Sequence, residues 1–218
     1  MVKKILSTVV LIFLFNFSFL TLAVELPKYF KFPKKYFKGK FYNSYENLLL
    51  VATAKLNDPR FKKSVIVILD HDEKGAIGLV VNKLIKEFPL RDLIDKSKNT
   101  DITKKKLYDV KIPIYWGGPI DEGEIFILHS NDYKNDTTKF FSNLGLSRGN
   151  KILFEIAEKK GPKESLVIVG LSAWTLGQLD GEVEKGDWTF TEIKNDLIFN
   201  KENQIKWRTA IKNQFIPL

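Results

Sequence analysis

The sequence predicts a mixed α/β (α+β) protein, built as a single compact domain behind an N-terminal signal or anchor segment. Short β-branched apolar runs interleave with amphipathic segments along residues 46–218, without the strict repeat of a parallel βαβ sheet. The chain has 218 residues, of which 44% are hydrophobic and 28% are charged, and this composition is typical of a folded protein. A chain of this length can bury a core as one domain.

Strands are expected where short apolar runs lie between turn residues. Asn57-Asp58-Pro59 is such a turn, because proline restricts its own φ and biases the preceding residue away from the helical region. The expected strands cover residues 48–52, 64–69, 76–81, 112–120, 123–130, 165–174 and 187–193.

Helices are expected where apolar residues recur every three or four positions. Ile152, Leu153, Ile156 and Ala157 have this spacing, and Gly161-Pro162 behind them is a typical stop signal. The expected helices cover residues 90–96, 149–162, 174–186 and 201–213, and polar loops are expected at 100–111 and 131–140.

Asp70, His71, Asp72 and Glu73 are consecutive between two expected strands, and Lys74-Gly75 follows them. Carboxylates beside an imidazole are the groups that a divalent metal or an acid–base site requires. Metal ligands must converge, however. Asp70 is expected to end a strand face, and the side chains of His71, Asp72 and Glu73 diverge at the turn itself. The pattern therefore predicts a hairpin turn and no metal site.

Trp116-Gly117-Gly118-Pro119 ends one expected strand and is a candidate ligand-binding segment. Paired glycines let a ligand approach bare backbone, and proline stiffens the bend. The segment has neither the G-x-G-x-x-G pattern nor the lysine of a phosphate-binding loop, so it does not indicate a nucleotide site. A tight turn at the strand end is the alternative interpretation.

Ser172 follows an apolar run and precedes an expected helix, which is the setting of a hydrolase nucleophile. The nucleophile elbow requires G-x-S-x-G, whereas residues 170–174 read Gly-Leu-Ser-Ala-Trp. His71 and His129 are the available bases, so a small-molecule or acyl hydrolase is the alternative function.

Three more residues are ligand-binding candidates. His129 ends an alternating face of its expected strand, where a histidine with a structural hydrogen bond is the other interpretation. Trp174 and Gln178 are four residues apart in an expected helix, so they share a face that lines a groove or caps the core.

The net charge of +9 is concentrated near the N-terminus. Residues 1–23 carry +2, residues 24–45 carry +5, and residues 46–218 carry only +2. The nearly neutral domain does not indicate nucleic-acid binding. The absence of cysteine excludes disulfides, thiol catalysis and cysteine-bound metal, and no cofactor is expected.

Residues 1–23 have the pattern of a secretory signal. Lys3 and Lys4 precede an apolar run from Ile5 to Ala23, and Thr21-Leu22-Ala23 is an acceptable cleavage site. The run of 19 residues is also long enough to cross a bilayer as an uncleaved anchor. Either interpretation places the domain outside the cytoplasm, in the periplasm or at a membrane.

Residues 24–45 are expected to form a linker or arm in which lysines alternate with aromatic residues. A lysine close to an anionic lipid surface contributes ~1 kcal/mol, so Lys28, Lys31, Lys34 and Lys35 are candidates for contact with a membrane. The alternative is that the aromatic residues pack on the domain that follows.

Five sequence blocks occur in a characteristic order. They are LLLVATAKLNDPRFKKSVIVILDHDEKGAIGLVVNK, PIYWGGPI, FILHS, VIVGLSAWTLGQLDGEVEKGDW and LIF with a later tryptophan. From about Asn47 to Phe215 they closely resemble the AlgH/YqgE family of bacterial proteins. The resemblance implies a compact mixed α/β domain with a highly curved sheet and flanking helices. It implies no reaction, because the family's biochemistry is unsettled and its name reflects a suggested regulatory role in alginate production.

The chain departs from this family in two respects. The family is usually leaderless and cytoplasmic, which makes the cytoplasm the alternative location, and Leu84 stands where proline usually follows Val81-Asn82-Lys83. An exported protein cannot contact the chromosome, which disfavours a direct transcriptional role. The expected function is therefore non-enzymatic binding or regulation, with an unknown protein or a small molecule as the partner.

Overall fold

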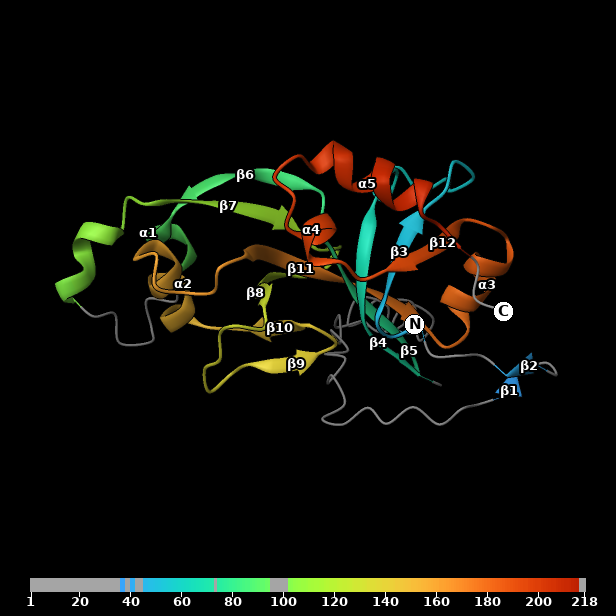
Figure 1. Ribbon diagram of the computed structural model, residues 1–218, viewed down its shortest axis with the longest axis horizontal. Coiled ribbons are helices and arrows are strands. Elements are labelled where there is room, and N and C mark those ends of the chain that lie inside the picture. The colour runs from blue at the N-terminus through green and yellow to red at the C-terminus, as the bar shows by residue number, and fades with distance from the viewer. Residues whose placement is uncertain (1–35, 38–39, 42–44, 73, 95–101, 216–218) are drawn as a thin grey trace, which may run out of the picture. The chain divides into compact units, whose positions relative to one another are not determined.

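The computed structural model describes residues 36–37, 40–41, 45–72, 74–94 and 102–215 (Figure 1). The chain divides into two units, residues 1–30 and 31–218, and the second is described below. The expected signal or anchor and most of the expected arm lie outside the described residues; of the arm, only strands β1 (Tyr36–Phe37) and β2 (Lys40–Phe41) and Tyr45 are described. Within the described ranges, no helix has the length and apolar character needed to cross a membrane.

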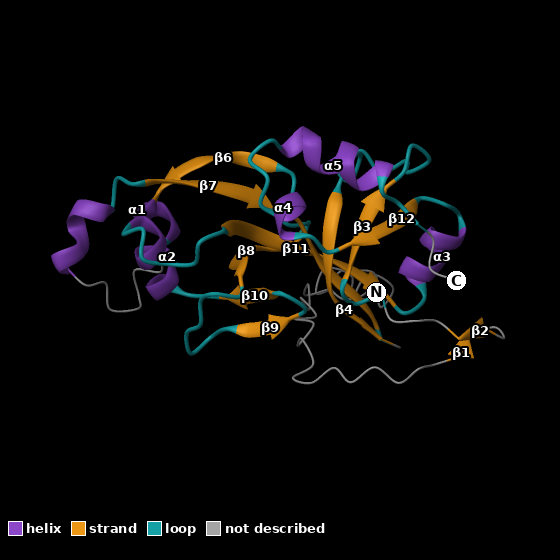
Figure 2. Ribbon diagram, in the orientation of Figure 1, coloured by secondary structure: helices purple, strands orange, loops and turns teal. Residues whose placement is uncertain are grey.

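Ten of the described strands form one curved sheet around the long strand β11 (Ser165–Thr175; Figure 2). The C-terminal half of β11 pairs with β5, and the order continues through β4 and β3 to β12. The N-terminal half pairs with β7 on one side and with β8 on the other. The bounds are β3 (Leu48–Ala52), β4 (Val65–Asp72), β5 (Gly75–Val80), β6 (Leu84–Pro89), β7 (Lys111–Trp116), β8 (Ile120–Ser130), β9 (Lys139–Phe141), β10 (Leu144–Ser147) and β12 (Trp188–Glu192).

Strand β6 extends the sheet beyond β7, and β10 and β9 extend it beyond β8. Among the described pairs only β7 with β11 is parallel. The predicted class, mixed α/β with a curved sheet flanked by helices, is confirmed.

The helices pack on the sheet faces and at its ends (Figure 2). Helix α5 contacts β3, β4 and β12, whereas α3 contacts β5, β11 and β12. The bounds are α1 (Leu90–Leu93), a 3₁₀ helix (Ile102–Leu107), α2 (Asn150–Ala157), α3 (Gln178–Glu184), α4 (Asn195–Ile198) and α5 (Asn203–Lys212).

The sheet formed by β3, β4 and β5 is buried on both faces. Successive side chains of a strand point to opposite faces, so Leu49 and Val51 join one core and Leu50 and Ala52 join another. The first core also contains Ala210 of α5, and the second contains Leu179 of α3 and the tryptophans at 174 and 188. Two-sided burial explains why these strands are continuous apolar runs.

The structure corrects the sequence prediction at several elements. β6, β9, β10 and α4 were not expected, and the 3₁₀ helix lies in the expected loop 100–111. The first four residues of β6 are exposed, so this strand lacks the pattern of buried apolar residues from which the other strands were predicted. The expected helix 174–186 begins only at Gln178, because β11 continues to Thr175 through pairing with β5.

Candidate functional site

The acidic cluster lies in the predicted hairpin, but His71 and Asp72, which were expected in the turn, lie in the strand together with Asp70. Strand β4 continues to Asp72, and Asp70, His71 and Asp72 pair with Ile77, Ala76 and Gly75 of β5. Asp72 Oδ1 accepts a hydrogen bond from the backbone N–H of Lys74 (2.6 Å), as expected of a turn aspartate. Glu73 lies outside the described residues.

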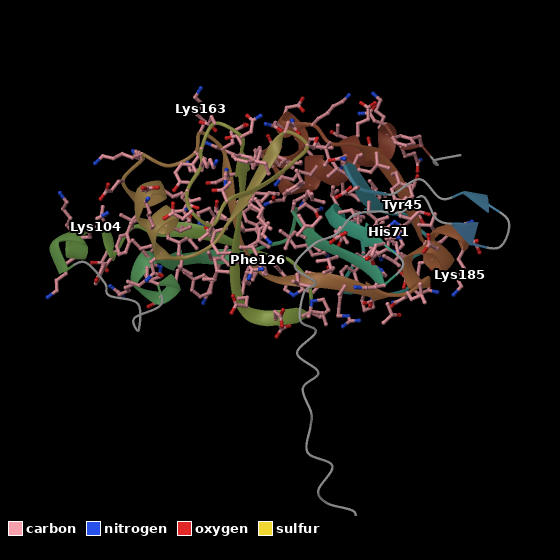
Figure 3. The ribbon with its side chains drawn as sticks, turned by 90° about the horizontal axis from the view of Figure 1, so that it is seen from below. Tyr45, His71, Lys104, Phe126, Lys163 and Lys185 are labelled. Carbon is pink, nitrogen blue, oxygen red and sulfur yellow. The ribbon has the colours of Figure 1, made fainter. Side chains whose placement is uncertain are left out.

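His71 is buried and faces a carboxylate from a distant part of the chain. Its ring stacks on Tyr45 with 4.5 Å between the centroids, and the two side chains lie together in Figure 3. The backbone N–H of Tyr45 donates to Nδ1 (3.4 Å), and Nε2 lies 3.6 Å from Oδ2 of Asp180. Burial alone would raise the pKa of Asp180, but hydrogen bonds from His71 and Tyr45 and the charge of His71 hold it below its usual value.

Asp70, which precedes His71, has the largest pKa shift of the carboxylates in the described ranges. Burial, followed by the charges of Asp72 and Glu46, raises its pKa to about 7. Its Oδ1 is buried and makes no hydrogen bond in the part of the chain that the structure describes. Asp70 therefore changes its charge near neutral pH. Within those same ranges, no three His, Cys, Asp or Glu side chains are arranged to hold a metal.

Gly117 and Gly118 contact strand β11 at the point where β11 changes partners. A Cβ on Gly117 would lie 2.2 Å from the carbonyl oxygen of Gly170, and a Cβ on Gly118 would lie 2.2 Å from that of Leu171. Gly170 has a φ of +72°, and the β11/β8 register shifts beside it. The backbone of β11 therefore occupies the space that a side chain at either glycine would need.

Of the neighbours of these glycines, Trp116 is half-buried and its ring lies 5.3 Å from that of Phe61. Pro119 links the segment to β8. Both residues therefore flank the two glycines that contact β11.

Ser172 is buried, and its Oγ donates a hydrogen bond to the carbonyl oxygen of Gly117 (2.9 Å). No hydrogen bond joins Ser172 to His71 or His129 among the described residues. The hydrolase alternative required such a pair, and the structure gives it no support.

His129 is fully buried and takes part in a different serine contact. Its Nδ1 is 2.8 Å from the carbonyl oxygen of Ser130, which only accepts, so Nδ1 carries the proton. Nε2 then accepts from Ser147 Oγ at 2.9 Å, and Ser147 also meets Thr138 Oγ1 at 2.7 Å. Burial lowers the pKa of His129, and both His129 and Ser147 are fully buried. The pair joins β8 to β10.

Trp174 and Gln178 do meet, but through Glu182 and not as neighbours on a helix. Glu182 Oε2 accepts from the indoles of Trp174 (3.0 Å) and Trp188 (2.7 Å), and Oε1 accepts from Gln178 (3.0 Å). Gln178 Oε1 also accepts from the backbone N–H of Thr175 (3.1 Å). These contacts fasten α3 to the sheet.

The structure contains a site that the sequence did not predict. A cavity of about 290 Å³ lies between helix α5 and the sheet edge where β4 begins and β5 ends. Because β4 and β5 are antiparallel, the segments before β4 and after β5 meet at this edge. We call this cavity the α5 pocket; it is lined by Lys62, Lys63, Asn82, Lys83, Asn203, Gln204, Trp207 and Arg208.

The wall of the α5 pocket is held in place by hydrogen bonds. Asn82 Oδ1 accepts from the backbone N–H of Val65, and Nδ2 donates to the carbonyl oxygen of Lys63, both at 2.8 Å. Lys83 Nζ donates to the carbonyl oxygen of Lys62 (3.0 Å). On the opposite wall, Trp207 Nε1 donates to the carbonyl oxygen of Ala52 (2.8 Å). The two walls are therefore formed before any ligand arrives.

The charge of the α5 pocket is all of one sign. Its lining contains four cationic side chains and no carboxylate. None of the four makes an ion pair with another described residue. Lys63 has a φ of +57°, a strained conformation for a lysine, and its Nζ lies 5.5 Å from the centre of the Trp207 ring. Burial lowers the pKa of Lys83.

Lys206, on the same helix, is a fully buried amine. Its Nζ donates to the carbonyl oxygen of Val81 (2.7 Å) and lies 5.0 Å from the centre of the Tyr115 ring. Burial lowers the pKa of Lys206 to about 7, and no described carboxylate forms an ion pair with it. Val81 directly precedes the pocket residues Asn82 and Lys83, so Lys206 ties α5 to that wall.

Comparison with known proteins places the domain in a family. The family model described as AlgH-like matches residues 49–218. The chain is 39% identical over 176 residues to a UPF0301 protein of Rickettsia canadensis, and 40% identical over 176 residues to one of Rickettsia massiliae. Each alignment covers 80% of this chain and 90% of the relative.

Solved structures show the same fold. The solution structure of the AlgH protein from Pseudomonas aeruginosa matches with a TM-score of 0.64 and 26% identity, over 81% of this chain and 92% of that one. A crystal structure of a protein from Corynebacterium diphtheriae matches with a TM-score of 0.59 and 18% identity, over 81% and 90% of the two chains.

Proposed function

This chain belongs to the AlgH-like family, and we propose that its domain is a non-enzymatic binding protein that holds a small anion in the α5 pocket. The single observation that carries the proposal is the lining of this pocket, with four cationic side chains and no carboxylate. Like charges gathered around a cavity repel one another, so a bound anion relieves a cost that the empty domain bears.

The chemistry of the lining suits a phosphate or carboxylate group. Arg208 offers a planar fork of donors, and Lys62 and Lys63 offer exposed ammonium groups. Hydrogen bonds between such cations and anionic oxygens are about twice as strong as neutral ones. Because hydrogen bonds fix Asn82, Lys83 and Trp207 beforehand, binding has to order only the remaining side chains of the lining.

The volume favours a compact ligand. Small-molecule sites usually enclose roughly 300–1,000 Å³, and the α5 pocket encloses about 290 Å³. The domain as a whole carries a net charge of only +2 over residues 46–218, which does not favour a long polyanion such as nucleic acid. A free phosphate, a phosphate ester or a small carboxylate is the class of ligand that we propose.

Calorimetric titration of the full chain with inorganic phosphate tests this proposal. We expect saturable one-site binding that Arg208→Gln weakens about tenfold or more, because a hydrogen bond to a charged group contributes about 1.5–3 kcal/mol. Lys212→Gln is the matched control, since it removes one positive charge from an exposed position of the same helix outside the pocket.

Two results would contradict the proposal. One is the absence of saturable binding of phosphate, pyrophosphate and acetate. The other is an equal loss of phosphate affinity in Arg208→Gln and Lys212→Gln, which would show that the loss depends only on the net charge of the protein. If a 20-base oligonucleotide bound with higher affinity than pyrophosphate, the ligand of the pocket would be a polyanion and not a small anion.

We also propose that residues 1–23 direct export, and that Lys28, Lys31, Lys34 and Lys35 hold the domain near an anionic membrane surface. The support is the sequence pattern alone: a basic start, an apolar run and an arm of charge +5. Fractionation of the producing cells with mass analysis of the mature N-terminus is expected to find Val24 first, or the intact chain in the membrane fraction. An intact chain that begins at Met1 in the cytoplasmic fraction would contradict it.

A further inference from the structure

We propose that Lys83 is a modification site, at which small acyl phosphates bound in the α5 pocket transfer their acyl group to the Nζ amine. This inference rests on the proposed anion-binding function of that pocket.

The position of Lys83 favours reaction over simple ion pairing. Lys83 follows β5, its side chain is half-buried, and its Nζ is held at the pocket wall by the carbonyl oxygen of Lys62 (3.0 Å). An amine that donates one hydrogen to this carbonyl keeps its lone pair for another direction. The other three cations of the lining stay available for a bound anion.

Burial supplies the reactive form of the amine. An ordinary exposed lysine, with a pKa near ~10.4, is almost entirely protonated at neutral pH and is then not a nucleophile. Burial lowers the pKa of Lys83, so a larger fraction of its amine is unprotonated. Desolvation is one of the ways in which a lysine is activated to attack a carbonyl carbon.

Acyl phosphates match the pocket because they combine an anion with an activated carbonyl group. Arg208, Lys62 and Lys63 would hold the phosphate oxygens and place the carbonyl carbon beside Lys83. The amine nitrogen attacks this carbon, the bond between the carbon and the phosphate oxygen breaks, and an N–C amide bond forms. The amine proton passes to solvent and inorganic phosphate leaves, so no other reactant is required. Holding both groups in one cavity raises the rate through proximity.

Acylation would also change what the pocket binds. Conversion of an ammonium group to a neutral amide removes one positive charge and one charged donor from the wall. The modified protein is therefore expected to bind inorganic phosphate with lower affinity than the unmodified protein. Exposure to acyl phosphates would therefore cause a lasting loss of anion binding at this site.

Peptide mass spectrometry of the full chain treated with acetyl phosphate at pH 7.5 tests the inference. Lys212, exposed on α5 outside the pocket, is the internal control. We expect initial acetylation of Lys83 at least about tenfold faster than that of Lys212, because Lys83 combines an amine whose pKa is lowered by burial with a donor bound beside it. Inorganic phosphate should slow the reaction at Lys83 and not at Lys212, and Arg208→Gln should do the same.

Acetic anhydride, an acetylating reagent that carries no phosphate, is the control for binding of the phosphate group. Its preference for Lys83 should be smaller, and free phosphate should not change it. Equal rates at Lys83 and Lys212 with acetyl phosphate would overturn the inference, and so would a preference for Lys83 that neither phosphate nor Arg208→Gln reduces. If phosphate still bound by calorimetry, the proposed function would stand without the inference; if it did not, both would fail.

Discussion

Replacement of Lys206 by methionine is expected to stabilise the domain at pH 6 and to destabilise it at pH 10. The Nζ of Lys206 is fully buried and its pKa is lowered by burial to about 7, against an ordinary value of 10.5. Between these two values the unfolded chain holds a proton that the folded chain lacks, so stability rises with pH across this window. Below pH 7 both states are protonated and the cost of the buried charge is fully present.

The size of this effect follows from the shift in pKa. Each unit corresponds to about 1.4 kcal/mol, so the cost below pH 7 is on the order of 3–5 kcal/mol. Methionine has a similar shape and removes this cost, but it leaves the carbonyl oxygen of Val81 without its donor, a loss of about 1–3 kcal/mol at any pH. The first effect dominates at pH 6. At pH 10, just below the ordinary pKa of 10.5, less than about 1 kcal/mol of the first effect remains, so the second effect is the larger one.

Urea unfolding of the wild type, Lys206→Met and Lys212→Met at pH 6, 7, 8, 9 and 10 measures this directly. The difference between Lys206→Met and the wild type should change sign across the series. Lys212 is exposed on the same helix, and its variant should follow the wild type. A difference that stayed constant from pH 6 to pH 10 would show that Lys206 does not titrate in this window.

Replacement of Gly118 by alanine is expected to cost about 3–5 kcal/mol of the free energy of unfolding. A Cβ there would lie 2.2 Å from the carbonyl oxygen of Leu171 and 2.4 Å from the amide nitrogen of Ser172. Both are backbone atoms of the central strand β11, so neither can turn away as a flexible side chain would. Gly118 also has a φ of +148°, which L side chains rarely adopt.

Gly123→Ala is the matched control for this prediction. Gly123 lies on the exposed part of β8, and a Cβ there would meet nothing within 4 Å. Thermal and urea unfolding should leave the Gly123 variant close to the wild type, and the Gly118 variant should unfold far earlier or be insoluble. Equal stability of the two variants would mean that Gly117-Gly118 is not in contact with β11 and is free for a ligand.

The strands that are buried on both faces were predictable from the sequence. Leu48–Ala52 was expected at the bounds that the structure shows, because its five apolar residues leave no polar face. The exposed strand Leu84–Pro89 had no such pattern, and its pairing with β7 depends on residues far along the chain. Trp174 was expected where a strand ends and a helix begins, but it pairs with Ala76 inside the strand, and this tertiary contact outweighs the local preference.

The α5 pocket escaped prediction for a related reason. Lys62 and Lys83 are separated by two whole strands, and Arg208 is more than a hundred residues further along the chain. The net charge of residues 46–218 averages the cations of the pocket with carboxylates elsewhere. The signal was present as Lys62-Lys63 and Asn82-Lys83 inside the first family block, but only the antiparallel pairing of β4 and β5 brings these dipeptides together.

The most direct measurement of the central claim, that the α5 pocket binds a small anion, is titration of the ¹⁵N-labelled full chain with inorganic phosphate followed by NMR. Trp207 Nε1–H and the side-chain amide of Asn82 are reporters in the pocket walls, whereas the indoles of Trp174 and Trp188 are hydrogen-bonded to Glu182 elsewhere. The account predicts saturable shifts of the Trp207 and Asn82 signals with one common binding constant, unchanged Trp174 and Trp188 signals, and loss of the response in Arg208→Gln. Unchanged Trp207 and Asn82 signals, or shifts that grow linearly with phosphate in both the wild type and Arg208→Gln, would contradict it.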